Sequence, residues 1–174
     1  RSQGVRSEYL RFAFEPRVLK LLGAVQPRHA VVFVGGYTSN HSNGNGLFEH
    51  VAGQVPVDFW GYGIEALAAT SSIRRSYHDE AWGMQMYRIL AESKISLNRH
   101  IDLSDRFANN MRLFETTGVG ALLVTDWKEN LHEMFEVGKE VVAYRTAQEC
   151  AELITHYLAH DEERGAVALA GQER

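Results

Sequence analysis

The stretch Ala30-Val31-Val32-Phe33-Val34 decides the fold class of this 174-residue chain. Five apolar residues in succession are typical of a parallel strand whose two faces are both covered by helices. Weaker strand candidates lie at residues 57–60 and 95–98. Two further runs have the same continuous apolar character as the first, Ala121-Leu122-Leu123-Val124 and Glu140-Val141-Val142-Ala143-Tyr144.

Helical patterns lie between these predicted strands. Residues 46–53 predict a short helix, and residues 84–93 a firmer one with Met84 on its inward face. Residues 109–117 predict a third helix, which ends at Gly118.

Two more helices follow toward the end of the chain. Thr146 and Glu149 match a capping box, in which each side chain bonds the backbone N–H of the other residue. The last helix runs from near Asp161 to near Gly171. Strands and helices alternate from Ala30 onward, so we predict an α/β fold with a mainly parallel sheet, forming a single domain over residues 1–174. The helix opened by the capping box carries one apolar stripe: Ala147, Cys150, Ala151, Ile154, Tyr157 and Leu158.

Composition excludes several classes of protein. The 18 basic and 22 acidic residues give a net charge of −4 with no basic block, which argues against binding nucleic acid or a membrane surface. One cysteine, Cys150, excludes a disulfide scaffold and cysteine zinc sites. No apolar run approaches the roughly 18 residues that a membrane span needs. We therefore expect a soluble, cytoplasmic protein.

Ligands of such sheets bind beyond the carboxyl ends of the strands. The loops expected there are residues 35–41, 61–63 and 99–109, and they are polar and rich in Gly, Asn and His. The first of them makes Tyr37, Thr38 and His41 candidate binding residues.

The segment Asn109-Asn110-Met111-Arg112-Leu113-Phe114-Glu115 is the most informative of the chain. If it is helical, Asn109, Arg112 and Glu115 share one face. Free N–H groups at the helix start favour a diphosphate, Arg112 can bond phosphate, and Glu115 can accept two ribose hydroxyls. Spacing alone, however, favours a plainer interpretation, an Asn cap followed by a surface Arg–Glu pair.

Several segments together resemble the nucleotide-sugar-binding half of GT-B glycosyltransferases, and among them the spore-maturation-type or group 1 family. The likeness is strong from about Ala81 onward and loose over residues 12–37. The order and spacing of the matching segments are specific to this family. The resemblance implies a Rossmann-like sheet with helices on both faces. The segments that carry it are Ser93-Lys94-Ile95-Ser96-Leu97-Asn98-Arg99-His100, residues 109–118, Leu122-Leu123-Val124-Thr125-Asp126, residues 130–135 and 138–144, and the closing residues 163–172.

The resemblance also implies roles for single residues. Glu115 matches the glutamate that holds the nucleotide ribose, and Asn110 and Met111 fall at the helix start that faces the donor diphosphate. His100 lies in a loop that lines the donor pocket. Trp82 and Gly83 open a helix where the nucleobase is lodged in the family.

Two departures from the family pattern concern the phosphates. Many relatives have a second glutamate eight residues before the ribose one, where this chain has Phe107. Many also use Arg and Lys after the first strand, where this chain offers His41, Asn43 and Asn45. The positive charge that neutralises the phosphates would then come from Arg112, Arg99 or Lys94.

Metal binding gains little support from the sequence. His156 and His160 are four residues apart on one helical face, but no third ligand is evident and the predicted ligand loops are far away. A solvated helix face is therefore expected there. No Asp-x-Asp pair follows a strand, so we expect metal-independent chemistry with neither a metal nor a cofactor.

The sequence thus predicts a donor-binding domain that takes a nucleoside diphosphate sugar for transfer to an unidentified acceptor. The resemblance implies an N-terminal acceptor-binding domain, for which 174 residues leave no room, and residues 6–22 would end the connection to it. The alternative is a nucleotide-binding or interaction module of the same fold without catalysis. A phospho-receiver domain is excluded because residues 35–40 hold no acidic side chain.

Overall fold

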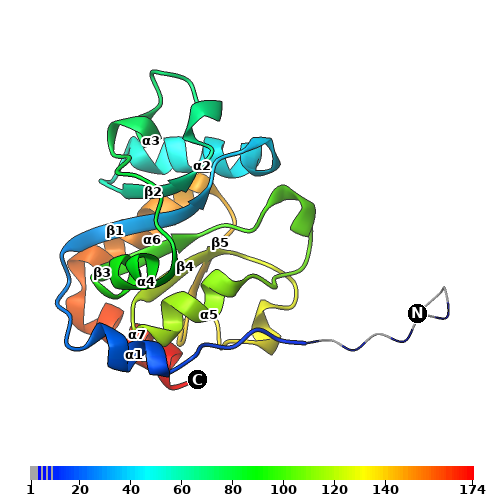
Figure 1. The fold of residues 1–174 in the computed structure, drawn as a ribbon, viewed down its shortest axis with the longest axis vertical. Helices are drawn as coiled ribbons and strands as arrows, with labels where there is room; N and C mark the ends of the chain where they lie inside the picture. The colour runs from blue at the N-terminus through cyan, green and yellow to red at the C-terminus, as the bar shows by residue number, and fades with distance from the viewer. Residues whose placement is uncertain (1–3, 5, 7, 9) are drawn as a thin grey trace.

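The computed structural model describes Gly4, Arg6, Glu8 and residues 10–174. In this part of the chain five strands form one parallel sheet, in the spatial order β2-β1-β3-β4-β5 (Figure 1). All five predicted strands are present, and the α/β fold with a parallel sheet is confirmed. The strands are β1 (His29–Gly36), β2 (Asp58–Tyr62), β3 (Ser93–Asn98), β4 (Leu122–Asp126) and β5 (Val142–Tyr144).

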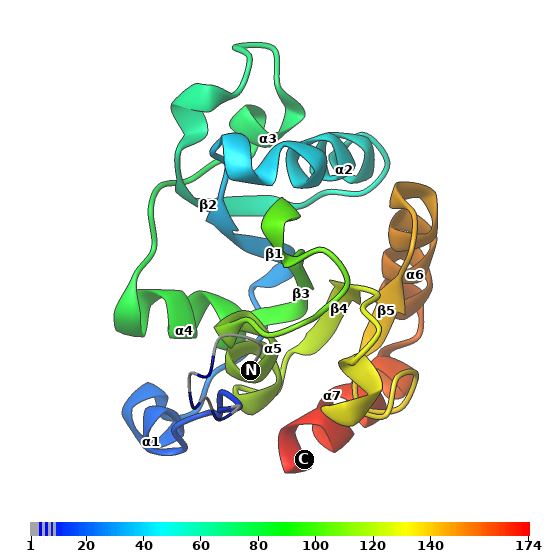
Figure 2. The ribbon, with the colours of Figure 1, turned by 90° about the vertical axis from the view of Figure 1, so that its right-hand side faces the viewer.

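Helices cover both faces of the sheet, and this explains why β1 is apolar at successive positions. Val31 and Phe33 belong to a core shared with α2 (Ser42–Ala52) and α6 (Ala147–Ala159). Val32 and Val34 point to the other face. There they pack with α1 (Arg17–Leu22) and α4 (Gly83–Ala91). Figure 2 shows α4 and α6 on opposite sides of the strands.

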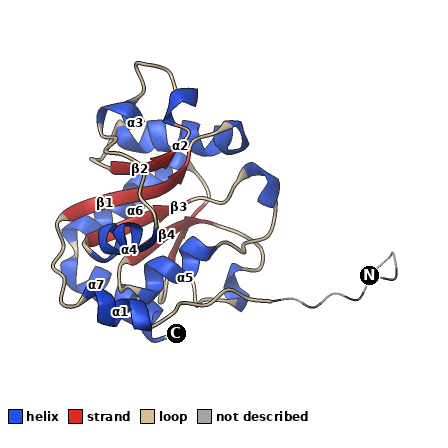
Figure 3. Ribbon diagram, in the orientation of Figure 1, coloured by secondary structure: helices blue, strands red, loops and turns tan. Residues whose placement is uncertain are grey.

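The remaining helices extend these two layers (Figure 3). Helix α5 (Met111–Gly118) packs on β4 through Leu113 and Leu123, and α7 (Asp161–Glu173) contacts both α5 and β4. No helix in the described residues is long and apolar enough to cross a membrane. The short helical segments are α3 (Ser72–Arg75), η1 (Ser39–His41), η2 (Ile64–Ala66), η3 (Asp102–Ser104) and η4 (Leu131–Glu133).

Helix α2 begins at Ser42, four residues before the predicted start. Its first turn contains poor helix formers, but tertiary contacts stabilise it. The carboxylate of Asp102 accepts hydrogen bonds from the Asn43 backbone N–H (3.2 Å) and the Ser42 hydroxyl (3.1 Å). The Asn45 side chain donates to the backbone oxygen of Tyr37 at 2.8 Å.

The predicted inward face of α4 is wrong at one position. Met84 is exposed and Met86 is buried in its place, beside Ile89 and Leu90. Met84 and Met86 are two residues apart on a short helix, so the sequence alone does not decide which of them faces the core. Packing against Trp60 on the sheet selects the phase that buries Met86.

Helix α5 begins at Met111, not at Asn109. Asn110 is its N-cap, with extended backbone and a side-chain oxygen that accepts from the Leu113 N–H at 3.3 Å. Asn109 therefore lies before the helix, and the expectation that it shares a helical face with Arg112 and Glu115 is wrong.

The capping box of α6 is half formed. The Thr146 hydroxyl accepts from the Glu149 N–H at 3.1 Å, as predicted. The Glu149 carboxylate instead accepts from the N–H of Arg145, one residue further back, at 2.6 Å. The predicted stripe faces the core, where burial raises the pKa of the Cys150 thiol to about 12, as expected of an inert packing residue.

Candidate functional site

The strand order creates a switch point between β1 and β3, because the chain leaves these neighbours in opposite directions along the sheet. A cavity of about 500 Å³ lies there, which is a volume typical of small-molecule sites. It is lined by the carboxyl ends of β1 and β3 and by the starts of α4 and α5. The cavity thus occupies the place where sheets of this kind bind ligands.

The start of α5 is fixed to the strand ends by side-chain amides. The Asn110 side chain donates to Asn98 Oδ1 at 3.1 Å, and the Asn98 side chain donates to Thr125 Oγ1 at 2.8 Å. The first N–H groups of a helix have no partners within it, and the helix dipole favours an anion beside them. At Met111 and Arg112, which both line the cavity, this start can bind a negatively charged group.

Arg112 and Glu115 form an ion pair in the cavity wall, with Arg112 Nη1 2.7 Å from Glu115 Oε2. Their side chains are only 16% and 10% exposed, so this is not the solvated surface pair of the plainer interpretation. The other carboxylate oxygen of Glu115 accepts from the Tyr87 hydroxyl at 3.4 Å, and Arg112 Nη1 also lies 2.9 Å from Met86 Sδ.

Burial sets the electrostatics of this wall. Desolvation lowers the pKa of Arg112, and the charge of Glu115 opposes that shift. Burial is the main cause that raises the pKa of the Tyr87 hydroxyl, and the Glu115 carboxylate raises it further. The hydroxyl therefore stays a hydrogen-bond donor at neutral pH. A charged pair held in a partly desolvated wall gives strong, directional hydrogen bonds to a polar ligand.

Glycines form the β1 side of the cavity. A Cβ on Gly36 would come within 2.8 Å of Tyr62 and 2.9 Å of the His41 ring, so a larger residue would displace these side chains. His41 lines the cavity, and its Nδ1 lies 3.0 Å from the Thr38 hydroxyl. Burial lowers the pKa of His41, so the imidazole is neutral at pH 7 and cannot replace the missing cations.

Tyr37 and Thr38 lie behind this wall and do not line the cavity. Tyr37 is fully buried in the core, and its hydroxyl donates to the backbone oxygen of Trp60 at 2.9 Å. The two residues support the loop that carries His41.

The start of α4 supplies an aromatic platform at the cavity rim. The Trp82 side chain is 61% exposed and stacks on Tyr62, with ring centroids 5.6 Å apart and planes 19° apart. Its Nε1–H donates to Glu80 Oε2 at 2.8 Å, which fixes the ring. Gly83 follows with a φ of 53°, a conformation that favours glycine. An exposed, stacked indole can take a planar ring on its free face.

The loop after β3 brings Arg99 to the cavity but turns His100 away from it. Arg99 Nη2 lies 3.4 Å from Asp102 Oδ1, and Arg99 Nη1 lies 4.0 Å from Asp126 Oδ2. Its Nε is buried without a hydrogen-bond partner among the described residues. Arg99 lines the cavity and so brings a positive charge to its wall.

His100 is buried against the end of β4. Asp126 Oδ1 accepts from the His100 backbone N–H at 2.9 Å and from its Nδ1 at 2.8 Å. Burial alone raises the pKa of Asp126, but these bonds outweigh it and hold the pKa below its usual value. His100 thus anchors the loop that carries Arg99, whereas the sequence placed it in the pocket lining.

A second cavity, of about 420 Å³, lies at the opposite end of α5, beside Gly118. The N-terminal segment from Arg11 to Pro16 forms one wall, with Phe14 against Gly118. Of the predicted connection over residues 6–22, residues 11–14 and 16 line this cavity, and residues 7 and 9 lie outside the described residues. This cavity is away from the carboxyl ends of the strands, so we favour the first one.

Seven of the eleven binding residues predicted from the sequence line the favoured cavity: His41, Trp82, Gly83, Asn110, Met111, Arg112 and Glu115. Asn109, His100, Tyr37 and Thr38 do not. Sequence reasoning missed Met86 and Tyr87 on α4, together with Asn98 and Ile101. The sequence could have indicated Asn98, because it ends a predicted strand and ligands bind beyond the carboxyl ends of such strands. Tyr87 could not be found in this way, because only the structure shows which side of α4 faces the cavity.

Fold and site together define an α/β domain with an open helix start and a buried Arg–Glu ion pair at the switch point of a parallel sheet. The family described as "Glycosyl transferase-like" matches residues 43–174, about three quarters of the sequence, and the chain belongs to this family. A search of curated proteins finds no match.

Solved structures show the same fold. The C-terminal domain of the group 1 glycosyl transferase LpcC from Francisella tularensis matches with a TM-score of 0.57 at 9% identity, covering 86% of this chain and 85% of that one. Anabaena HepE, in complex with UDP-glucose, matches with a TM-score of 0.65 at 15% identity, covering 99% and 53%. The glycosyltransferase AviGT4, involved in avilamycin A biosynthesis, matches with a TM-score of 0.63 at 18% identity, covering 98% and 56%. The chain therefore spans about half of the length of the last two.

Proposed function

We propose that the chain is the donor-binding domain of a GT-B glycosyltransferase of the spore-maturation-type or group 1 kind, and that its cavity binds a nucleoside diphosphate sugar. The observation that carries the proposal is the Arg112–Glu115 pair in the cavity wall, one turn beyond the open start of α5. Glu115 is thereby within reach of a ribose whose diphosphate lies at that helix start.

The rest of the cavity supports this placement. The diphosphate would accept hydrogen bonds from the first N–H groups of α5, with Arg112 and Arg99 supplying positive charge. The nucleobase would lie on the exposed face of Trp82, at the rim. Gly83 is exposed and leaves the backbone accessible on the α4 side of the cavity.

The proposed reaction breaks the bond between the sugar and the diphosphate, and negative charge develops on the departing diphosphate. Helix N–H groups and the two arginines are preorganised to stabilise this charge, which is an electrostatic mechanism that needs no metal. Glu115 fixes the ribose and so orients the sugar carbon.

The acceptor and the catalytic base would come from a second domain. HepE and AviGT4 are each nearly twice as long as the part that matches this chain, which supports the idea of such a partner domain. For the whole protein we propose transfer of a hexosyl or related group in the cytoplasm.

A second function, nucleotide binding without catalysis, is favoured by one observation. Arg99 and Arg112 are both already paired with carboxylates, Asp102 and Glu115, so a diphosphate must share them. A nucleotide can bind despite this competition, whereas sugar transfer needs the positive charge to be available to the departing diphosphate.

Calorimetric titration with uridine, guanosine and adenosine diphosphates in the presence of EDTA tests the proposal. We expect one of them to bind, and Arg99→Ala to weaken it by about 10- to 150-fold, the value of a charged hydrogen bond of about 1.5–3 kcal/mol. Arg11→Ala, at the second cavity, is the matched control and should bind as the wild type does. Binding of none of the three would refute donor binding. Binding only with Mg²⁺ or Mn²⁺ would refute metal independence, and binding without transfer by the full-length protein would favour the module.

A further inference from the structure

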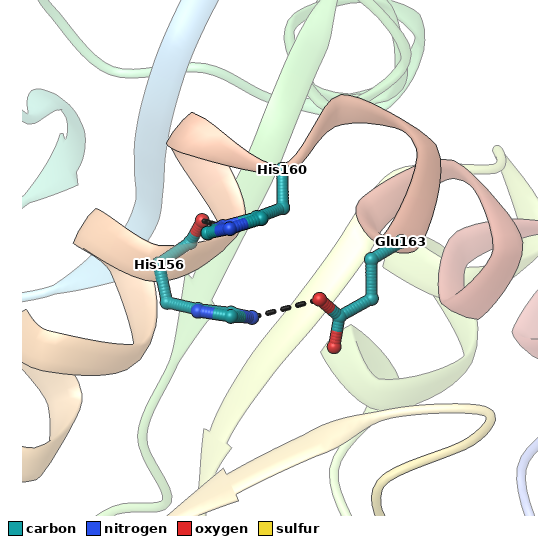
Figure 4. A group of neighbouring side chains, drawn as sticks. All are labelled: His156, His160 and Glu163. Carbon is teal, nitrogen blue, oxygen red and sulfur yellow. Dashed lines mark hydrogen bonds and ion pairs between the residues drawn. The ribbon is translucent and has the colours of Figure 1, made fainter.

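Three side chains with metal-binding groups meet at the junction of α6 and α7, away from the donor cavity (Figure 4). His156 lies on the last turns of α6, His160 joins the two helices, and Glu163 lies on the first turn of α7. One ligand atom from each lies within 4.8 Å of the other two, and all three residues are exposed. Glu163 is a candidate third ligand that the sequence did not indicate, because the change of direction between α6 and α7 brings it back toward His156.

Hydrogen bonds already orient the two imidazoles. His160 Nδ1 lies 2.7 Å from the backbone oxygen of His156, and because a carbonyl only accepts, this nitrogen carries the proton. In the neutral ring Nε2 then has a free lone pair. Metal-bound histidines almost always donate their other ring N–H in this way. The two rings stack, with centroids 4.2 Å apart and planes 23° apart.

The distances suit a small divalent ion. His156 Nε2 and Glu163 Oε2 are 2.8 Å apart and hydrogen-bonded, and a metal ion would replace the proton between them. Bonds of about 2.0–2.1 Å in a tetrahedral site place ligand atoms about 3.3 Å apart, so this pair would widen by about half an ångström. One ring nitrogen of His160 lies within 4.8 Å of the other two ligand atoms, and rotation of this exposed side chain would bring Nε2 to bonding distance.

We propose that His156, His160 and Glu163 form a binding site for a divalent transition metal of the zinc class, with water at the fourth position. Two imidazoles and one carboxylate are ligands that zinc prefers, whereas magnesium and calcium prefer oxygen alone. The bound ion connects the last turn of α6 to the first turn of α7. Since α7 packs on α5 and β4, the ion stabilises this packing. The site does not depend on the proposed function.

Calorimetric titration of the chain with zinc chloride tests the site. We expect one zinc ion per chain, no binding of magnesium, and an affinity at least about tenfold weaker in each of His156→Ala, His160→Ala and Glu163→Gln. The matched control is His78→Ala, because His78 is also an exposed histidine 2.9 Å from a carboxylate, that of Asp58. Its zinc affinity should equal that of the wild type.

Thermal melts give an independent readout. Zinc should raise the melting temperature of the wild type and of His78→Ala, and leave that of the His156→Ala/His160→Ala double variant unchanged. The ligand side chains are exposed, so we expect the variants to fold, and their circular dichroism checks this. Absence of saturable zinc binding, or an equal loss of affinity in His78→Ala, would overturn the proposal.

Discussion

Replacing Glu115 with Ala removes the partner of Arg112 and the proposed ribose acceptor at once. From the sequence alone, this variant is expected to keep its fold, but the structure changes that expectation. The side chains of Arg112 and Glu115 are 16% and 10% exposed. Removing one partner of a buried ion pair lowers the free energy of unfolding by about 3–5 kcal/mol. We expect about 3 kcal/mol, since the pair borders an open cavity, and hence a melting temperature about 6–12 °C lower.

The loss in nucleotide affinity is a separate quantity. Hydrogen bonds from ribose hydroxyls to a carboxylate contribute about 1.5–3 kcal/mol, or about 10- to 150-fold in affinity. Stability and binding are separated by a cycle with two ligands, the nucleoside diphosphate that binds and its 2′,3′-dideoxy form. The dideoxy form should bind the wild type about as weakly as the parent ligand binds Glu115→Ala, and the variant should not distinguish the two.

Calorimetry well below the melting temperature of the variant measures both affinities, and a thermal melt measures the stability. A second variant, Arg112→Met/Glu115→Leu, provides a check, since replacing both charges with apolar side chains restores most of the stability but no binding. If the wild type binds both ligands equally, Glu115 does not hold the ribose, and the reasoning fails.

Three other predictions concern the backbone, the acid stability and the activity. Gly83→Ala places a side chain at a φ of 53° with no atom within 4 Å, so backbone strain alone should cost about 1–2 kcal/mol, whereas the control Gly165→Ala, without that strain, should melt no lower than the wild type. The lowered pKa of Asp126 stabilises the fold above the unfolded value of about 3.9 and ceases to do so as the pH falls through the folded value. The difference in urea stability between the wild type and Asp126→Asn should therefore be largest at pH 7 and shrink below about pH 4; a constant difference would contradict this. The 174-residue chain alone should transfer no sugar, and turnover on the order of 1 per second would refute the need for a second domain.

The sheet could be predicted from the sequence because buried parallel strands are apolar on both faces. The runs at residues 30–34 and 121–124 need no tertiary information to be recognised, and their alternation with helices fixes the α/β class. The resemblance then assigned Glu115 to the ribose and helical spacing placed Arg112 beside it, and both line the favoured cavity.

Helix starts and phases could not be predicted, because distant residues decide them. Asp102 binds the start of α2 from a loop 59 residues away, and sheet packing buries Met86 in place of Met84. The cap at Asn110 moves Asn109 out of α5, since its amide competes with helical backbone hydrogen bonds. His100 was misplaced for a similar reason, since only the fold shows that Asp126 takes its side chain.

The central claim is that a nucleoside diphosphate binds at the switch point of the sheet, and amide chemical shifts of the ¹⁵N-labelled chain test it most directly. Titration with the nucleoside diphosphate that binds in calorimetry should move the amides of Gly36, Gly83, Met111 and Arg112, which line the cavity between β1 and β3. The amides around Gly118 and Gln172, at the second cavity, should stay in place. Shifts confined to the second cavity, or none at saturating nucleotide, would contradict the claim.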